Sequence, residues 1–446
     1  MSSTRTSSPG ASSPGASSPG ASSPGASSTA AANGDTPRAT TRRTPPATPL
    51  GRPQWLVLAI AVLVGVALVV AVVAVAGAQL GVLTGLGLAL GLALFHSRFG
   101  FTSAWRQLVS VGQTSGLRAH LLMLGVASVL FAPILAGGAG LFDTTPRASV
   151  SPIGVGLLVG ALLFGIGMQL GGACASGTLF ALGGGSTLML VTLFFFIAGS
   201  VLGAAHWGFW TSDALTWGPV SLATSTGLGY GGALVLQLAV FGALAWIAVR
   251  VSRRRTPPPA GRPPTARGAL RVLRGSWPLW VGALVLAGLN ALVLLVRGTP
   301  WGITSAFVLW GSKALQALGV DVASWTYWQG ANAASLAKPV LADSTSVLDL
   351  GIVVGALVAS ASSGVFVLAK RLPARTVLAA VLGGLLMGYG ARLAYGCNIG
   401  AYFSGIASFS LHGWIWGAMA LAGTWIGLKL RPLFGLGVPK PSDSVC

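Results

Sequence analysis

Ten long apolar segments constrain the fold of this chain more than any other feature of the sequence. A helix needs roughly 20 mostly apolar residues to cross the hydrocarbon core of a membrane. Segments of this kind lie at about 54–77, 79–96, 120–140, 153–170, 187–207, 228–250, 278–296, 347–369, 376–394 and 411–430. Because unpaired backbone polar groups are costly in lipid, we expect each segment to be helical. The sequence therefore predicts an all-α polytopic membrane protein with about ten transmembrane helices.

The charged residues support this class and exclude another. Only 8% of the 446 residues are charged, whereas soluble domains contain about 25%. The net charge of +20 comes from basic residues in the N-terminal tail and between the apolar segments. They do not form an arginine stripe interleaved with aromatic residues, so nucleic acid is excluded as a partner. The expected surroundings are a lipid bilayer.

The basic residues also predict which loops face the cytoplasm. Arg38, Arg42, Arg43 and Arg52 precede the first span and place the N-terminus inside. The loop around Asp213 contains neither lysine nor arginine, and we expect it outside. The linker at 251–276 contains three consecutive arginines at 253–255, and the tail at 433–446 follows Lys429 and Arg431, so the linker and the tail are both expected inside.

A short stretch with a central cysteine occurs twice. Residues 165–177 align with residues 388–400 at a constant offset of 223, which matches two glycines, a leucine, the cysteine and the glycine three places later. A second element, Gly-x-Thr-Ser-Ala, occurs at 100–104 and 302–306. Spans two to five and seven to ten carry these elements in the same order, but the predicted topology orients the two sets oppositely. Inverted-topology repeats are typical of transporters, with the site near the membrane midplane.

The predicted organisation has six parts. Residues 1–52 contain four tandem Ser-Ser-Pro-Gly-Ala units and are expected to be a disordered cytoplasmic tail, since they cannot bury a core. The other parts are an extra transmembrane helix at 53–78, the first transporter repeat plus a connector helix at 79–250, the cytoplasmic Arg/Pro-rich linker at 251–276, the second inverted repeat at 277–432 and a cytoplasmic tail at 433–446.

The cysteine elements are the predicted site. Their glycines interrupt a helix, and broken backbone at membrane depth must be buried in protein or line a cavity. We therefore expect short re-entrant or broken helices, whose free N–H groups and positive dipole attract anions. A polarizable cysteine sulfur at such a break suits a sulfur-bearing oxyanion. The candidate path residues are Gly172, Cys174, Ser176, Gly177, Arg392, Gly396, Cys397, Asn398 and Gly400.

Other interpretations of these residues stay open. A buried cysteine usually behaves as a small hydrophobe, and glycines let membrane helices pack closely. Arg392 lies five residues before Cys397 within an apolar segment. Because an arginine in the membrane is costly, we expect it to contact either the substrate or a gate, or to bond backbone carbonyls as a structural partner. Gln169 occupies the equivalent position in the first half. No cluster of histidines or acids accompanies the cysteines, so neither zinc nor another cofactor is expected. The residues expected at the membrane interface are His96, His120, His206, His412, Trp207, Trp210, Trp414 and Trp416.

At these elements the sequence resembles the YeeE/YedE family. The matching stretches, between about residues 80 and 430, are the two cysteine elements, Phe101 to Arg106 and Pro300 to Phe307. The resemblance implies an inverted-repeat helical fold in the plasma membrane of a bacterium, and thiosulfate passage along cysteines that hold the anion by weak S–H hydrogen bonds. Cys174 and Cys397 match two of these cysteines, whereas Gly100 replaces a further one.

The predicted function is import of thiosulfate or a related sulfur-containing anion, without enzymatic activity. One alternative is a transporter of a selenium species or another sulfur species. A second is a membrane sulfurtransferase that carries a persulfide on Cys174 or Cys397 to a cytoplasmic sulfur acceptor protein. A third is a structural or partner-binding membrane subunit. The sequence has no Walker-type phosphate loop, so we expect no ATP coupling by this chain.

Overall fold

The computed structural model describes residues 50–259, 265–266, 268–368 and 372–443. All its long helices belong to one unit, Arg43–Cys446. Apart from residues 50–52, the tail predicted to be disordered lies outside the described residues. The longer helices are α1 (Trp55–Ala76), α2 (Ala78–Ser97), α3 (Phe101–Val111), α4 (Ser115–Gly137), α5 (Val155–Leu170), α6 (Ala175–Gly183), α7 (Thr187–Ala205), α9 (Gly229–Arg255), α11 (Leu279–Arg297), α12 (Thr304–Ala317), α14 (Ser344–Ser362), α15 (Ala374–Leu393) and α17 (Leu411–Leu430).

Short elements fill the connections between these helices. They are α8 (Trp207–Trp210), α10 (Leu270–Leu273), α13 (Ala333–Ala337), α16 (Gly405–Ala407), the 3-10 helices η1 (Val322–Ser324), η2 (Thr326–Trp328), η3 (Gly330–Asn332), η4 (Val340–Ala342) and η6 (Arg431–Phe434), and the π-helix η5 (Asn398–Ser404). Strands β1 (Pro152–Gly154) and β2 (Thr216–Pro219) pair antiparallel.

The predicted all-α polytopic class is confirmed. Within the described ranges, nine helical segments are long and apolar enough to cross a membrane. The expected tenth span forms α17, which is 20 residues long but is not among those nine. Two of the nine segments, Ala78–Val111 and Val155–Gly183, each join a long helix to a short one. The sidedness of the loops stays a prediction.

The two halves repeat one packing scheme. Helices α2 to α7 correspond in order to α11, α12, α14, α15, η5 with α16, and α17. The packing of α2 on α14 matches that of α11 on α4, and the packing of α7 on α15 matches that of α17 on α5. The corresponding helices α5 and α15 run antiparallel, since Gly160 meets Gly390 and Gly167 meets Gly383. Opposite directions for equivalent helices are what inverted repeats require.

Glycines set how closely these helices approach. A Cβ added to Gly91 of α2 would lie 2.2 Å from the carbonyl oxygen of Ile352 on α14, and one on Gly383 would lie 2.2 Å from the backbone nitrogen of Gly171. The hydrophobic effect does not drive helices together within lipid, so close packing of the helix backbones stabilises their association instead. The glycines of these spans are therefore needed for the fold as well as for the breaks.

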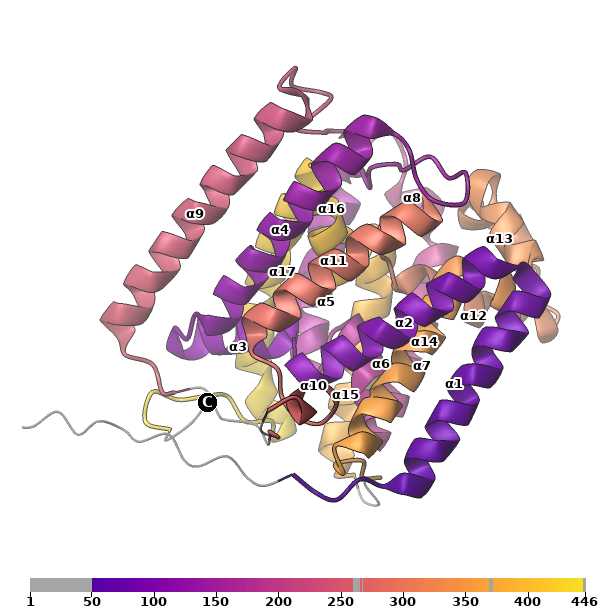
Figure 1. The fold of residues 1–446 in the computed structure, drawn as a ribbon. Coiled ribbons are helices and arrows are strands. Elements are labelled where there is room, and N and C mark those ends of the chain that lie inside the picture. Colours follow the sequence, from indigo (N-terminus) through magenta and orange to yellow (C-terminus); the bar gives the residue numbers. More distant parts are fainter. Residues whose placement is uncertain (1–49, 260–264, 267, 369–371, 444–446) are drawn as a thin grey trace, which may run out of the picture. The chain divides into compact units, whose positions relative to one another are not determined.

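Helices α1 and α9 lie at opposite edges of the bundle (Figure 1). They are the least buried of the nine apolar segments. This arrangement suits the predicted extra helix and connector helix, which have no counterpart in the repeats.

The interface expectation for aromatic and histidine side chains is wrong for several of them. His96, His120, His412 and Trp416 are buried inside the protein, whereas His206 is exposed. The ring of His120 stacks on that of Phe101 with centroids 4.3 Å apart. Position near a span end therefore does not separate lipid-facing from inward-facing side chains, because the face of the helix decides between them.

Candidate functional site

The first cysteine element lies between two helices, α5 and α6. Helix α5 ends at Leu170 and α6 begins at Ala175, and between them Gly172 has a φ of +84°, a backbone conformation that favours glycine. Cys174 is the N-cap residue of α6 and is 1% exposed. Its Sγ lies 3.5 Å from Oγ of Ser176. The thiol is thus buried at the N-terminus of a resumed helix.

The second cysteine element resumes differently. Helix α15 ends at Leu393, and Tyr395 and Gly396 have φ values of +58° and +148°. Cys397 is again an N-cap residue and 1% exposed, and its Sγ accepts a hydrogen bond from the N–H of Ile399 at 3.5 Å. The chain then forms the π-helix η5, an element that is rare and frequent at functional sites.

The two breaks adjoin one another and the Gly-x-Thr-Ser-Ala elements. Helices α6 and η5 are in contact, and both cysteines belong to the same buried cluster. A Cβ on Gly177 would lie 3.5 Å from Sγ of Cys174, and one on Gly400 would lie 3.8 Å from Cα of Gly302. The glycines of the elements therefore leave the space beside the breaks free of side chains.

Asn398 directly follows Cys397 and is unsatisfied. Its side chain is completely buried, and neither its amide nitrogen nor its oxygen has a hydrogen-bond partner among the residues described. Buried polar groups are nearly always hydrogen-bonded, so such an exception needs an explanation. A polar ligand beside Cys397 would supply one.

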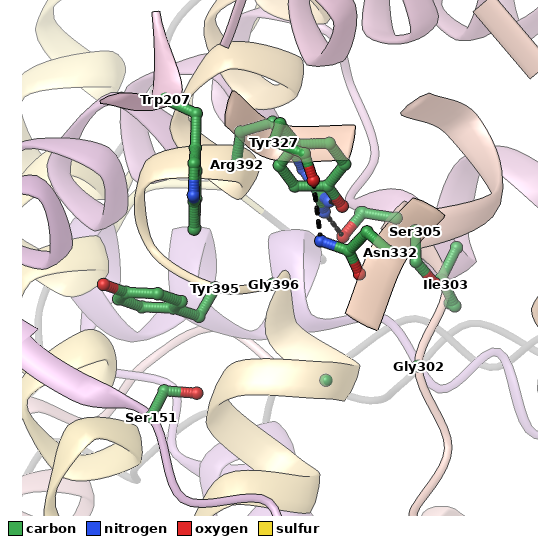
Figure 2. Close-up of a pocket in the computed structure, with 12 residues that line it drawn as sticks. Ser151, Trp207, Gly302, Ile303, Ser305, Tyr327, Asn332, Arg392, Tyr395 and Gly396 are labelled. Carbon is green, nitrogen blue, oxygen red and sulfur yellow. Dashed lines mark hydrogen bonds between the residues drawn. The ribbon is translucent and has the colours of Figure 1, made fainter. Parts of the chain in front are cut away.

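A cavity of about 280 Å³ lies at the second break (Figure 2). Trp207 and Tyr395 form an aromatic side with ring centroids 5.5 Å apart. Tyr327 also packs edge-on against Trp207, with ring centroids 5.3 Å apart, whereas Asn332 and Ser305 lie across from Trp207 and Tyr395 (Figure 2). The complete lining is Ser151, Trp207, Gly302, Ile303, Thr304, Ser305, Tyr327, Asn332, Arg392, Tyr395, Gly396 and Gly400. Three of the predicted path residues, Arg392, Gly396 and Gly400, therefore border one space.

Arg392 carries a buried positive charge at the edge of this cavity. Only 6% of the residue is exposed. Its guanidinium donates hydrogen bonds to the hydroxyls of Tyr327 and, at 3.1 Å, Thr304. Its Nε has no partner in the described part of the chain. Neutral hydroxyls do not balance a buried charge, so this position favours an anion. Its side-chain partners are hydroxyls, not the backbone carbonyls of the structural alternative.

At the first break, Gln169 occupies the position of Arg392, and the nearby positive charge comes from Arg431. Gln169, at the position of Arg392, donates to the carbonyl oxygen of Thr102 at 3.2 Å, just as Arg392 contacts Thr304. Its Oε1 has no partner among the described residues. The buried Arg431 donates to the carbonyl oxygen of Gln169. The basic-loop pattern used Arg431 only to predict topology, and nothing in the sequence indicates this contact.

Sequence reasoning also missed Asp349. It lies in α14, is completely buried, and neither carboxyl oxygen has a hydrogen-bond partner within the described ranges. An ionisable residue inside an apolar span is a signal of function. That signal was visible, since Asp349 falls in the predicted span at 347–369.

Two further points concern Gly100 and metal binding. Gly100, where the resemblance implied a further cysteine, precedes α3, and a Cβ there would lie 2.9 Å from Oγ of Ser103. Over the described residues, no group of three or more His, Cys, Asp or Glu side chains could hold a metal ion.

These features define a class of protein. Two antiparallel halves, each with a buried cysteine between two helices, and a buried arginine of the second half beside each cysteine element, have the architecture of a membrane transporter. A family model described as sulphur transport matches residues 96–426. The chain belongs to this sulphur transport family, which confirms the resemblance to YeeE/YedE.

The curated relatives agree with the family. The chain is 32% identical over 161 residues to the probable transporter YedE of Escherichia coli (strain K12), a match that covers 35% of this chain and 39% of that relative. It is 27% identical over 343 residues to the thiosulfate transporter TsuA of Spirochaeta thermophila, covering 74% of this chain and 93% of TsuA. The TsuA of Escherichia coli (strain K12) is also 27% identical, over 339 residues.

Proposed function

We propose that this protein imports thiosulfate or a related sulfur-containing anion along a path that includes Cys397 and Cys174. The observation that carries the proposal is the buried, unpaired charge of Arg392 at a cavity that borders the Gly396–Cys397 break. The names of the TsuA relatives support the choice of anion. The proposed location is the plasma membrane of a bacterium, with both termini in the cytoplasm.

The path begins in the cavity beside Arg392. An anion there gains the guanidinium and the second amide hydrogen of the exposed Asn332, whose first one bonds the carbonyl oxygen of Tyr327. The aromatic side formed by Trp207 and Tyr395 suits the large, polarizable sulfur end of thiosulfate. Beyond Gly396 the anion reaches the thiol of Cys397 and the unsatisfied amide of Asn398, which donates a hydrogen bond to it.

The second stage passes between the halves. Since α6 and η5 are in contact, the anion moves from Cys397 towards Cys174 and Ser176, where Gly172 and Gly177 leave room. Gln169 and Arg431 then provide the next polar groups. An S–H donor binds weakly, so the anion leaves each sulfur without a large barrier, whereas a strong site would retain it.

Two experimental variants test the cysteines. Cys174→Ala and Cys397→Ala should each abolish most thiosulfate uptake by vesicles, and serine should rescue poorly because it is smaller and more strongly hydrated. Cys446→Ala, at the chain terminus, is the control and should transport normally. Protein amount and monodispersity are measured in parallel. Near-normal uptake by the Cys174→Ala/Cys397→Ala double variant would exclude a path along the sulfurs.

The sulfurtransferase alternative gains no support from the structure. Each cysteine is 1% exposed, so neither sulfur can reach a cytoplasmic acceptor protein in this conformation. Incubation with thiosulfate followed by intact-mass measurement separates the two functions, because a persulfide enzyme retains one sulfur atom and a transporter does not. Uptake assays with selenium-containing and other sulfur anions as competitors define the substrate.

A further inference from the structure

Asp349 is a buried ionisable residue that has no role in the proposed anion path. Its side chain is 0% exposed, lies 1.5 turns into α14 by the helical repeat, and makes no hydrogen bond to any described residue. A buried carboxylate without partners is strongly disfavoured relative to the neutral carboxylic acid. The group is therefore suited to bind and release a proton as its surroundings change.

The charged neighbours of Asp349 connect it to the path. Asp343 at the start of α14 and Arg297 at the end of α11 lie within electrostatic range of it, and so does Cys397. Of the elements packed on α14, helices α1 and α6 and the 3-10 helix η4 carry no charged residue. Helix α2 carries His96 in its last turn, away from Gly87, which packs next to Asp349 on Leu348. Lys313 of α12 donates a hydrogen bond to the carbonyl oxygen of Leu336.

A proton fits this position better than a metal cation does. Hard cations require several oxygen ligands arranged around them. The nearest hydroxyls on α14 have other partners, since Thr345 accepts from Arg297 and Ser305, and Ser346 donates to Asp343. No described group forms a hydrogen bond with the Asp349 oxygens. A proton binds to a carboxylate without such a set of additional oxygen ligands.

We propose that Asp349 binds a proton that is carried with the imported anion. This inference rests on the proposed function. A negative charge near Cys397 repels an ionised Asp349, so anion binding favours its protonation, and by reciprocity protonation favours anion binding. A cavity of about 250 Å³ bordered by Arg297, Lys338 and Asp343 lies at the start of the same helix and gives water a way to approach.

The test uses the full chain in sealed proteoliposomes with a trapped pH dye. Adding thiosulfate outside, without any initial pH gradient, should acidify the lumen, and an imposed inward proton gradient should drive accumulation. Asp349→Asn should abolish the acidification and lower the gradient-driven accumulation of thiosulfate about tenfold, a typical size for coupling between two sites. Exchange of labelled for unlabelled thiosulfate at equilibrium needs no driving force and should persist in this variant.

The controls separate coupling from folding and from the function itself. Asp349→Glu keeps a protonatable group and should retain acidification, whereas Asp213→Asn, on an exposed loop, should match the unaltered protein. The proposal is wrong if the unaltered protein transports thiosulfate without proton entry, if a sodium gradient replaces the proton gradient, or if Asp349→Asn still acidifies the lumen. If the unaltered protein fails even to exchange thiosulfate, the proposed function itself is contradicted.

Discussion

At the scale of single residues, the unusual features are polar groups that the fold buries but does not satisfy. Among the described residues, the guanidinium of Arg392 donates hydrogen bonds only to hydroxyls, the side chain of Asn398 has no hydrogen-bond partner, and Oε1 of Gln169 is unpaired. Each such group lowers stability, because it lost water on burial and regained too little. All three residues lie at or beside the two breaks, where we propose that the anion passes.

Arg392→Gln should reduce thiosulfate uptake by about tenfold or more, because a hydrogen bond to a charged group contributes about 1.5–3 kcal/mol. Arg392→Lys should retain part of the activity, since it keeps the charge but loses the fork of donors. The matched control is Arg147→Gln, which removes an exposed arginine from a loop. Uptake by equal amounts of purified, monodisperse protein is the measurement. Loss of folded Arg392→Gln protein with normal specific uptake would support a structural role instead.

At the scale of helices and connections, apolar length and glycine spacing predict most of the architecture. The predicted spans at 153–170 and 376–394 match α5 and α15 closely, because a long apolar run in lipid has few structural solutions other than a helix. The connection at 318–343 was not predicted. It is built of short 3-10 and α-helical turns, which have no periodicity to detect, yet it supplies Tyr327 and Asn332 to the cavity. The contact of Arg431 with Gln169 joins residues 262 positions apart, and no local pattern encodes it.

Gly383→Ala tests the close contact between α15 and the first break. The added Cβ would lie 2.2 Å from the nitrogen of Gly171, so the backbones must separate, and overpacking of this kind costs about 1–3 kcal/mol. We expect a lower midpoint of thermal unfolding in detergent and reduced uptake. Gly288→Ala on α11 is the control, because its Cβ would meet no atom within 4 Å. Equal unfolding midpoints for the two variants would show that this contact is not limiting.

At the scale of the whole molecule, the antiparallel relation of α5 and α15 makes a prediction about sidedness. The loop containing Ser212 and the end of α9 at Ser252 should face opposite sides of the membrane, because one long apolar helix separates them. Ser212→Cys and Ser252→Cys are each made in a Cys446→Ala background. An impermeant maleimide added to intact cells should label only Ser212→Cys. Labelling of both positions from the same side would contradict the inverted arrangement.

The most extensive helix pairings all join one half to the other: α7 to α15, α2 to α14, and α5 to both α15 and α17. This has a consequence for biogenesis. Equivalent elements are 223 residues apart, so at about 5–20 residues per second the ribosome needs roughly 10–45 s to deliver the partners of the first half. During that interval the glycine-rich faces of α2, α5 and α7 are not yet covered by their partner helices α14, α15 and α17. The nascent protein therefore depends on completion of translation, or on an insertion factor that shields those faces, before it has a stable core.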